Sequence, residues 1–124
     1  GLVRQDHVTV LGSEADFHVM IGNLLDNAIR YTPVGGTVDV AVLAEGRQAM
    51  VEIRDTGPGI PTHTIGRVFE RFFRAAPHDV EGTGLGLAIA KAAASRNRAS
   101  LDLANRRDRS GLVARLTMRQ AQGP

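Results

Sequence analysis

The 124-residue sequence contains no cysteine, which excludes a disulfide framework, a thiolate zinc site and a cysteine nucleophile. Tryptophan is absent as well, and aromatic residues make up only 4% of the chain. No apolar run approaches the roughly 20 residues that a transmembrane helix needs, and no signal-peptide pattern follows Gly1. From these absences, and from the lack of an initiator methionine, we expect a soluble domain cut from a longer protein.

Lysine is nearly absent too, because Lys91 stands beside 14 arginines. The high pKa of arginine raises the pI to about 9.9 although the formal net charge is only +2. Seven of these arginines fall within residues 96–124, where a basic patch could meet nucleic acid or an anionic membrane. No aromatic residue beyond Phe73 is available to stack on a base. We therefore expect a solvated surface there, with no nucleic acid and no direct membrane contact.

Composition and periodicity are those of one globular domain over residues 1–124, with 43% apolar and 23% charged residues. A capping box at Ser13–Asp16 predicts the start of a helix, which Pro33 ends by restricting the residue before it. Elsewhere we expect strands at 8–11, 37–44, 49–55, 101–105 and 112–118, a short helical stretch at 62–73, an irregular segment at 74–82 and a helix at 84–96. The order favours an α+β two-layer sandwich, with a mixed, mostly antiparallel sheet covered on one face by helices.

The first of three candidate motifs lies on the first predicted helix. Asn23, Asn27, Arg30 and Tyr31 share a stripe there, because residues four and seven apart lie on one face. An asparagine oxygen is a neutral ligand that suits Mg²⁺ still holding waters and phosphate oxygens. A polar helix edge without function explains the same stripe equally well.

The second motif begins at Asp55, which ends a predicted strand on the same face as Val51 and Ile53. A carboxylate on this inward face is costly unless a group donates hydrogen bonds to it, and the exocyclic amine of adenine is such a donor. Gly57 and Gly59 let the backbone approach a flat ligand. By itself, an aspartate that caps a turn is the simpler interpretation.

The third motif is a glycine-rich segment with Gly82, Gly84 and Gly86 at the start of the helix predicted over 84–96. Backbone N–H groups at such a helix start can form an anion site. The spacing fits neither the dinucleotide-binding fingerprint nor a Walker loop, so this segment alone is weak evidence.

Taken in order, with Phe69–Arg74 between the last two, these motifs resemble the ATP-binding catalytic domain of sensor histidine kinases in the GHKL superfamily, which has the Bergerat fold. The resemblance runs from about Val8 to Met118. It implies a domain that binds Mg²⁺ and ATP and donates the γ-phosphate to a histidine on a separate dimerisation domain. It also implies a response regulator as indirect partner and a homodimeric parent protein in the bacterial inner membrane, with this fragment as a monomeric cytoplasmic part.

Roles for individual residues follow from the same resemblance. Asn27 matches the Mg²⁺ ligand, Asp55 the acceptor of the adenine amine, and Arg74 an arginine that approaches the γ-phosphate. Phe69 and Phe72 match the anchor of a mobile ATP lid at about residues 74–82. The implied nucleotide-binding set is Asn23, Asn27, Arg30, Tyr31, Asp55, Gly57, Gly59, Ile60, Arg74, Gly82, Thr83, Gly84, Leu85, Gly86 and Leu87.

The chain departs from the family pattern in two places. The family often has His-Gly-Gly after its last helix, whereas this chain has Asn97–Ala99, and we expect Asn97 to take the left-handed conformation that ends the helix. No histidine of this chain lies in the family's phospho-acceptor context. We therefore expect it to bind ATP without autophosphorylating.

Two alternative functions stay open. A GHKL ATPase module of the gyrase or heat-shock type has a glutamate where this chain has Asn23, and an amide cannot act as a general base. A nucleotide-binding scaffold without transfer activity would carry the same residues as a kinase.

Overall fold

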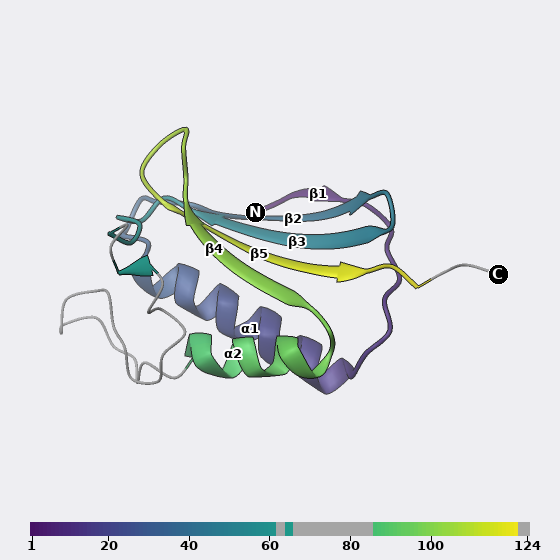
Figure 1. The fold of residues 1–124 in the computed structure, drawn as a ribbon. Helices are drawn as coiled ribbons and strands as arrows, with labels where there is room; N and C mark the ends of the chain where they lie inside the picture. Colours follow the sequence, from purple (N-terminus) through teal and green to yellow (C-terminus); the bar gives the residue numbers. More distant parts are fainter. Residues whose placement is uncertain (62–63, 66–85, 122–124) are drawn as a thin grey trace.

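The computed structural model describes residues 1–61, 64–65 and 86–121, and Figure 1 shows a sheet with two helices on one face. The five strands lie in the order β1-β2-β3-β5-β4. Their bounds are Leu2–Gln5 for β1, Val38–Glu45 for β2, Gln48–Asp55 for β3, Ser100–Asn105 for β4 and Leu112–Arg119 for β5. β1 runs parallel to β2, and the other neighbours pair antiparallel. The predicted α+β sandwich with a mixed, mostly antiparallel sheet is confirmed.

The first helix, α1 (Glu14–Tyr31), begins and ends where the sequence predicts. The Ser13 hydroxyl accepts a hydrogen bond from the N–H of Asp16 at 3.2 Å, which satisfies one of the free donors of the first turn. At the other end, Thr32 is extended, as expected for a residue that precedes proline.

The second helix, α2 (Gly86–Arg96), lies beside α1 and runs antiparallel to it (Figure 1). Gly84 and Leu85, which the prediction included in this helix, lie outside the described residues. So do residues 62–63 and 66–82, which hold all but two residues of the predicted helical stretch at 62–73 and the whole irregular segment at 74–82.

The core fills the space between the helices and the inner face of the sheet. Large side chains that are almost wholly buried come from both layers, namely Met20, Leu24, Ile53, Leu101 and Leu116. α2 buries only alanines, at positions 90, 93 and 94. Small side chains let a helix approach its neighbours closely, so α2 packs tightly against α1, beside it on the same face of the sheet.

The predicted strand at 8–11 is wrong, because the first strand lies earlier and pairs parallel to β2. Asp6 ends this pairing: its N–H donates to the Val42 carbonyl, and its carboxylate accepts the N–H of Ala44 at 2.8 Å. A further strand residue would otherwise have bonded that N–H. Val8 and Val10 still pack against the core, and this alternate burial explains the strand-like pattern in the sequence.

The face of the sheet without helices holds a buried carboxylate between two arginines. Glu52 accepts from Arg115 at 2.9 Å and from Arg54 at 3.2 Å. Two other arginines of the basic C-terminal region also contact carboxylates, Arg96 at α2's end and Arg106 after β4. Three of the seven arginines in residues 96–119 are thus paired with carboxylates.

The end of α2 differs from the prediction in which residue takes the left-handed conformation. Arg98, with φ of +55°, takes it rather than Asn97. The Ala99 N–H bonds back to the Ala94 carbonyl at 2.9 Å and the Arg98 N–H to the Ser95 carbonyl at 3.3 Å. This is a Schellman motif with arginine at the position where glycine is most common.

Asn97 instead joins the two helices through its side chain. Its amide oxygen accepts from the Ser13 N–H at 2.9 Å, and its NH₂ donates to Asp16 and to the Ala93 carbonyl, both at 2.8 Å. Arg96 also donates to Asp16. These contacts hold the pKa of Asp16 below its usual value, because they favour the charged carboxylate.

We expect Arg98→Gly to raise the free energy of unfolding by about 0.5–1 kcal/mol. Glycine adopts the left-handed conformation without the penalty that a Cβ imposes, and this gain exceeds its extra entropy in the unfolded chain. Urea denaturation measures the change. Ser95→Gly, three residues earlier and inside the helix, should destabilise by about 1 kcal/mol, and a loss of stability in both variants would contradict the prediction.

Asn97→Ala should lower the free energy of unfolding by about 2 kcal/mol, because it removes two hydrogen bonds to the distant start of α1 and one to the Ala93 carbonyl within α2. Ser95→Ala is the control on the same helix.

The contacts of the Asp16 carboxylate stabilise the folded state at pH values above the unfolded carboxyl pKa near 3.9. This stabilisation is lost as the pH falls through the lower pKa of the folded state. The deficit of Asn97→Ala should therefore shrink below about pH 4 in urea titrations, and a deficit independent of pH would contradict this account.

Candidate functional site

The candidate site is centred on Asp55, at the end of β3. This aspartate is only 4% exposed. One carboxylate oxygen, Oδ1, accepts from the N–H of Gly57 at 2.9 Å and from the N–H of Leu112 at 3.1 Å. Within the described ranges, no group donates to Oδ2. Oδ1 thus caps the turn, as the simpler interpretation of the sequence has it, and Oδ2 is left as a buried acceptor. A buried acceptor without a donor is unusual in a folded protein.

The loop of residues 56–60 follows Asp55 and depends on its two glycines; we call it the adenine loop after the ligand that the sequence resemblance predicts here. A Cβ at Gly57 would lie 2.6 Å from the carbonyl oxygen of Tyr31, at the end of α1. Gly59 has φ of +75°, and a Cβ there would lie 2.6 Å from Oδ1 of Asn105. Close approach and backbone conformation therefore both require glycine in this loop.

The adenine loop is held from its other side by the β4–β5 turn, residues 106–111, together with Asn105 at the end of β4. The Ser110 hydroxyl donates to the carbonyl of Gly57 at 2.8 Å. Figure 1 shows this turn at the end of the sheet where β3 finishes. The sequence does not indicate roles for Asn105, Arg106 and Ser110, because their partners are 45 to 53 residues away and a polar turn carries no local signal of such contacts.

Arg106 places a positive charge behind the backbone of Asp55. Its guanidinium donates to the Asp55 carbonyl at 3.2 Å and pairs with Asp108 at 2.8 Å, and its side chain is 11% exposed. The same guanidinium lowers the pKa of Asp108 to about 2. Asp108 therefore keeps its charge at all ordinary pH values and fixes Arg106 against the site.

On the helix side, the structure brings Asn23 beside the start of α2. The Asn23 NH₂ donates to the carbonyl of Val19 at 2.8 Å, one turn earlier. A Cβ at Gly86 would lie 3.3 Å from Asn23 Oδ1. The first motif and the end of the third therefore meet, with Leu87 partly buried next to the contact.

Asn27 lies one turn further along α1 and is partly buried. Arg30, on the following turn, is exposed and pairs with Asp26 at 3.0 Å. Tyr31 is partly buried where α1 ends against the adenine loop. The four polar residues predicted on this helix thus lead from the start of α2 to the adenine loop.

Five predicted site residues lie outside the described ranges, together with the predicted lid at about 74–82: Arg74, Gly82, Thr83, Gly84 and Leu85. The part of the chain that the structure describes contains no group of three His, Cys, Asp or Glu residues able to hold a metal ion. It also contains no helix with the length and hydropathy needed to cross a membrane. A metal here would need oxygen ligands from a phosphate group in addition to the Asn27 amide.

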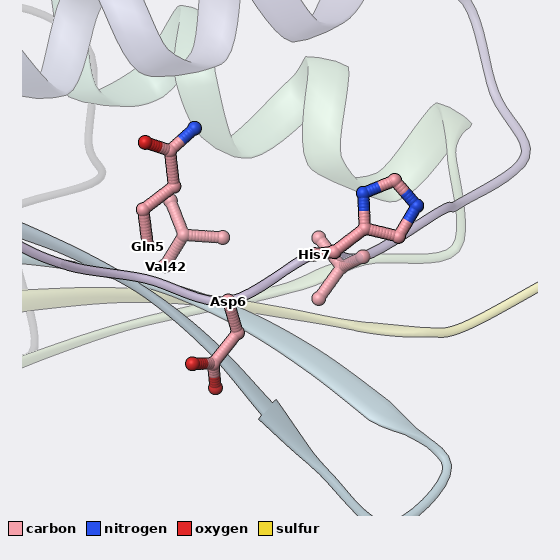
Figure 2. Close-up of a pocket in the computed structure, with 5 residues that line it drawn as sticks. Gln5, Asp6, His7 and Val42 are labelled. Atoms are coloured by element: carbon pink, nitrogen blue, oxygen red, sulfur yellow. The ribbon is translucent and has the colours of Figure 1, made fainter.

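A separate hollow of about 290 Å³ lies beside the end of β1 (Figure 2), lined by Gln5, Asp6, His7, Val8 and Val42. Val42 pairs with Val51, four residues along β3 from Asp55. Gln5 and His7 are exposed, and the hollow shares no residue with the candidate site.

Residues 12–122 match the family model described as histidine kinase-, DNA gyrase B- and HSP90-like ATPase. The chain belongs to this family. The solved mycobacterial sensor histidine kinase MprB is similar over 96% of this chain and 84% of its own, with 31% identity and a TM-score of 0.83. The chain is accordingly an ATP-binding catalytic domain of the histidine kinase type, which confirms the resemblance found in the sequence.

Other similar proteins are much longer than this domain. Sensor protein kinase PmrB of Pseudomonas aeruginosa is 35% identical over 97% of this chain but only 25% of its own length. The full-length protein ShkA, solved in complex with AMPPNP, has the same fold, with a TM-score of 0.78 and 23% identity over 98% of this chain and 26% of its own. The domain spans about a quarter of the length of the curated relatives that it matches.

Proposed function

We propose that this histidine kinase domain binds ATP with Mg²⁺ and donates the γ-phosphate to a histidine on the dimerisation domain of its parent kinase. The observation that carries the proposal is the buried carboxylate of Asp55, with Oδ1 satisfied and Oδ2 left to accept from the adenine amine. The AMPPNP bound by ShkA supports a nucleotide as the ligand.

The phosphates would lie between α1 and the start of α2. Asn27 would hold Mg²⁺ through its amide oxygen, and Arg30 lies one turn away as a cation. When bound, Mg²⁺ neutralises charge on the phosphate oxygens, which is the main requirement of phosphoryl transfer. We expect further backbone and side-chain contacts from the remaining predicted residues, Arg74, Gly82, Thr83, Gly84, Leu85, Gly86 and Leu87.

Asn23 supports transfer to a side chain over hydrolysis. Its NH₂ is engaged by the carbonyl of Val19, so its oxygen lies toward Gly86. An amide in this position orients groups but cannot remove a proton from water. This favours a kinase over a GHKL ATPase module.

For the parent protein we propose the organisation of a two-component sensor kinase. It would be a homodimer in the bacterial inner membrane, with this domain in the cytoplasm and a response regulator receiving the phosphate from the histidine. The similarity to sensor kinases four times longer supports this organisation.

Calorimetry with AMPPNP tests nucleotide binding, with and without Mg²⁺. We expect Asn27→Ala to weaken Mg²⁺-dependent binding at least tenfold, roughly the loss of one ligand contact, whereas His18→Ala on the same helix should bind like wild type. Unchanged Mg²⁺-dependent affinity in Asn27→Ala would contradict the site.

Transfer is tested with γ-labelled ATP and the dimerisation domain of the parent kinase. We expect acid-labile phosphate on that domain and none on this chain alone. Stable phosphohistidine on the isolated chain would contradict the proposed division of labour.

A further inference from the structure

The contacts of Asn105 with the adenine loop lead beyond the proposed function. We propose that Asn105 is a positioning residue, which fixes the adenine loop and thereby sets the selectivity of the site for adenine over other bases. This inference rests on the proposed function, because it concerns the same nucleotide.

The Asn105 side chain pairs with a single residue of the loop in both directions. Its Oδ1 accepts from the N–H of Ile60 at 2.8 Å, and its Nδ2 donates to the carbonyl of Ile60 at 2.6 Å. The pair resembles one rung of a β-ladder, with the amide in place of a neighbouring strand. With both backbone groups of Ile60 engaged, the loop can rotate little at this residue.

The adenine loop is shaped to receive this side chain. Gly59, directly before Ile60, has a positive φ and leaves no room for a Cβ next to Asn105 Oδ1. A larger residue at 59 would displace the amide, and a shorter one at 105 would leave the backbone groups of Ile60 without partners. Such partly buried groups are costly when unpaired.

The β4–β5 turn also positions Asp55, the proposed acceptor of the adenine amine. Leu112, directly after the turn, donates to Oδ1 of Asp55, and Ser110 donates to the carbonyl of Gly57. Since Oδ1 is held by two N–H groups, the direction of Oδ2 is set by the backbone around it. Asn105 lies at the start of this turn. It therefore fixes the adenine loop relative to the Asp55 carboxylate, which would accept the adenine amine.

Asn105→Ala and Asn105→Asp test this role, with Asp102→Ala on the same strand as control because Asp102 is exposed. Dissociation constants are measured by calorimetry for ATP, for ITP, which has a carbonyl oxygen in place of the adenine amine, and for inorganic tripolyphosphate, all with Mg²⁺. We expect Asn105→Ala to weaken ATP about tenfold, as for one or two lost hydrogen bonds. The affinity for ITP should fall less, so that the ratio of ATP affinity to ITP affinity decreases. The affinity for tripolyphosphate should change less than twofold.

An equal loss of affinity for all three ligands would overturn the inference, because a merely structural role of Asn105 predicts that result. An unchanged ratio of ATP affinity to ITP affinity would overturn it as well. If Asn105→Ala fails to fold, Asn105→Asp decides. It keeps the acceptor for the Ile60 N–H but replaces the donor with a carboxylate oxygen that faces the Ile60 carbonyl, so it should lower the same ratio. Wild-type protein that binds tripolyphosphate but prefers ITP would contradict the role of Asp55, and wild-type protein that binds no ATP would contradict the proposed function itself.

Discussion

Asp55→Asn is expected to weaken ATP binding about 100-fold while leaving the domain folded. The amide oxygen can still accept from Gly57 and Leu112, as Oδ1 does now. The NH₂ group then takes the place of Oδ2 and faces the adenine amine, so that two donors oppose each other. Loss of a hydrogen bond to a charged acceptor costs about 1.5–3 kcal/mol, which corresponds to roughly 10- to 150-fold in affinity.

The same substitution should reverse the preference for the base. ITP presents an oxygen where ATP presents its amine, and the new NH₂ can donate to that oxygen. Calorimetry should therefore show Asp55→Asn binding ITP more tightly than ATP, whereas Asp102→Asn, an exposed aspartate on β4, keeps the wild-type order. Binding of ATP by Asp55→Asn with wild-type affinity would rule out this carboxylate as the adenine acceptor.

Gly111→Ala is expected to have the largest effect on stability, a loss of about 3 kcal/mol. Gly111 is buried with φ of +143°, and a Cβ there would overlap the carbonyl oxygen of Asp55 and approach Arg106. An unfavourable backbone conformation costs about 1–3 kcal/mol, and the forced displacement of packed groups adds a similar amount.

Gly46→Ala is the matched control for Gly111→Ala. Gly46 also has a positive φ, of +58°, but a Cβ there would meet nothing within 4 Å. It should lose only about 1 kcal/mol in urea denaturation, from conformation alone, and keep its ATP affinity. Gly111→Ala should also bind ATP more weakly under conditions where it is fully folded, because Asp55 moves. Similar losses of stability in the two variants would show that the overlap with Asp55 adds nothing to the destabilisation by Gly111→Ala.

Features with a local cause could be predicted from the sequence. The Ser13 cap, the helix end before Pro33 and the inward direction of Asp55 depend on neighbouring residues or on strand alternation. The helix stripe and the Asp55 loop were found in the same way, and the structure brings Asn23 to Gly86 and Tyr31 to Gly57.

Features that depend on distant partners could not be predicted. The pattern at Val8 and Val10 is that of a strand, but the Asp6 carboxylate takes the N–H that would continue the ladder. Asparagine favours left-handed backbone, yet the distant contacts of Asn97 with α1 use its side chain, and Arg98 takes that conformation. Each outcome depends on a hydrogen bond between groups at least 38 residues apart in the chain, which no local pattern contains.

The contact between Asp55 and Leu112 also constrains when the pocket can form during synthesis. The two residues are 57 positions apart. β3 and the adenine loop therefore leave the ribosome well before Leu112, whose N–H donates to the Asp55 carboxylate. Long-range strand pairing is slow to form and follows local structure. A nascent chain would therefore carry every predicted nucleotide-binding motif up to Leu87 and still lack the Asp55–Leu112 contact until β5 has emerged and paired with β3.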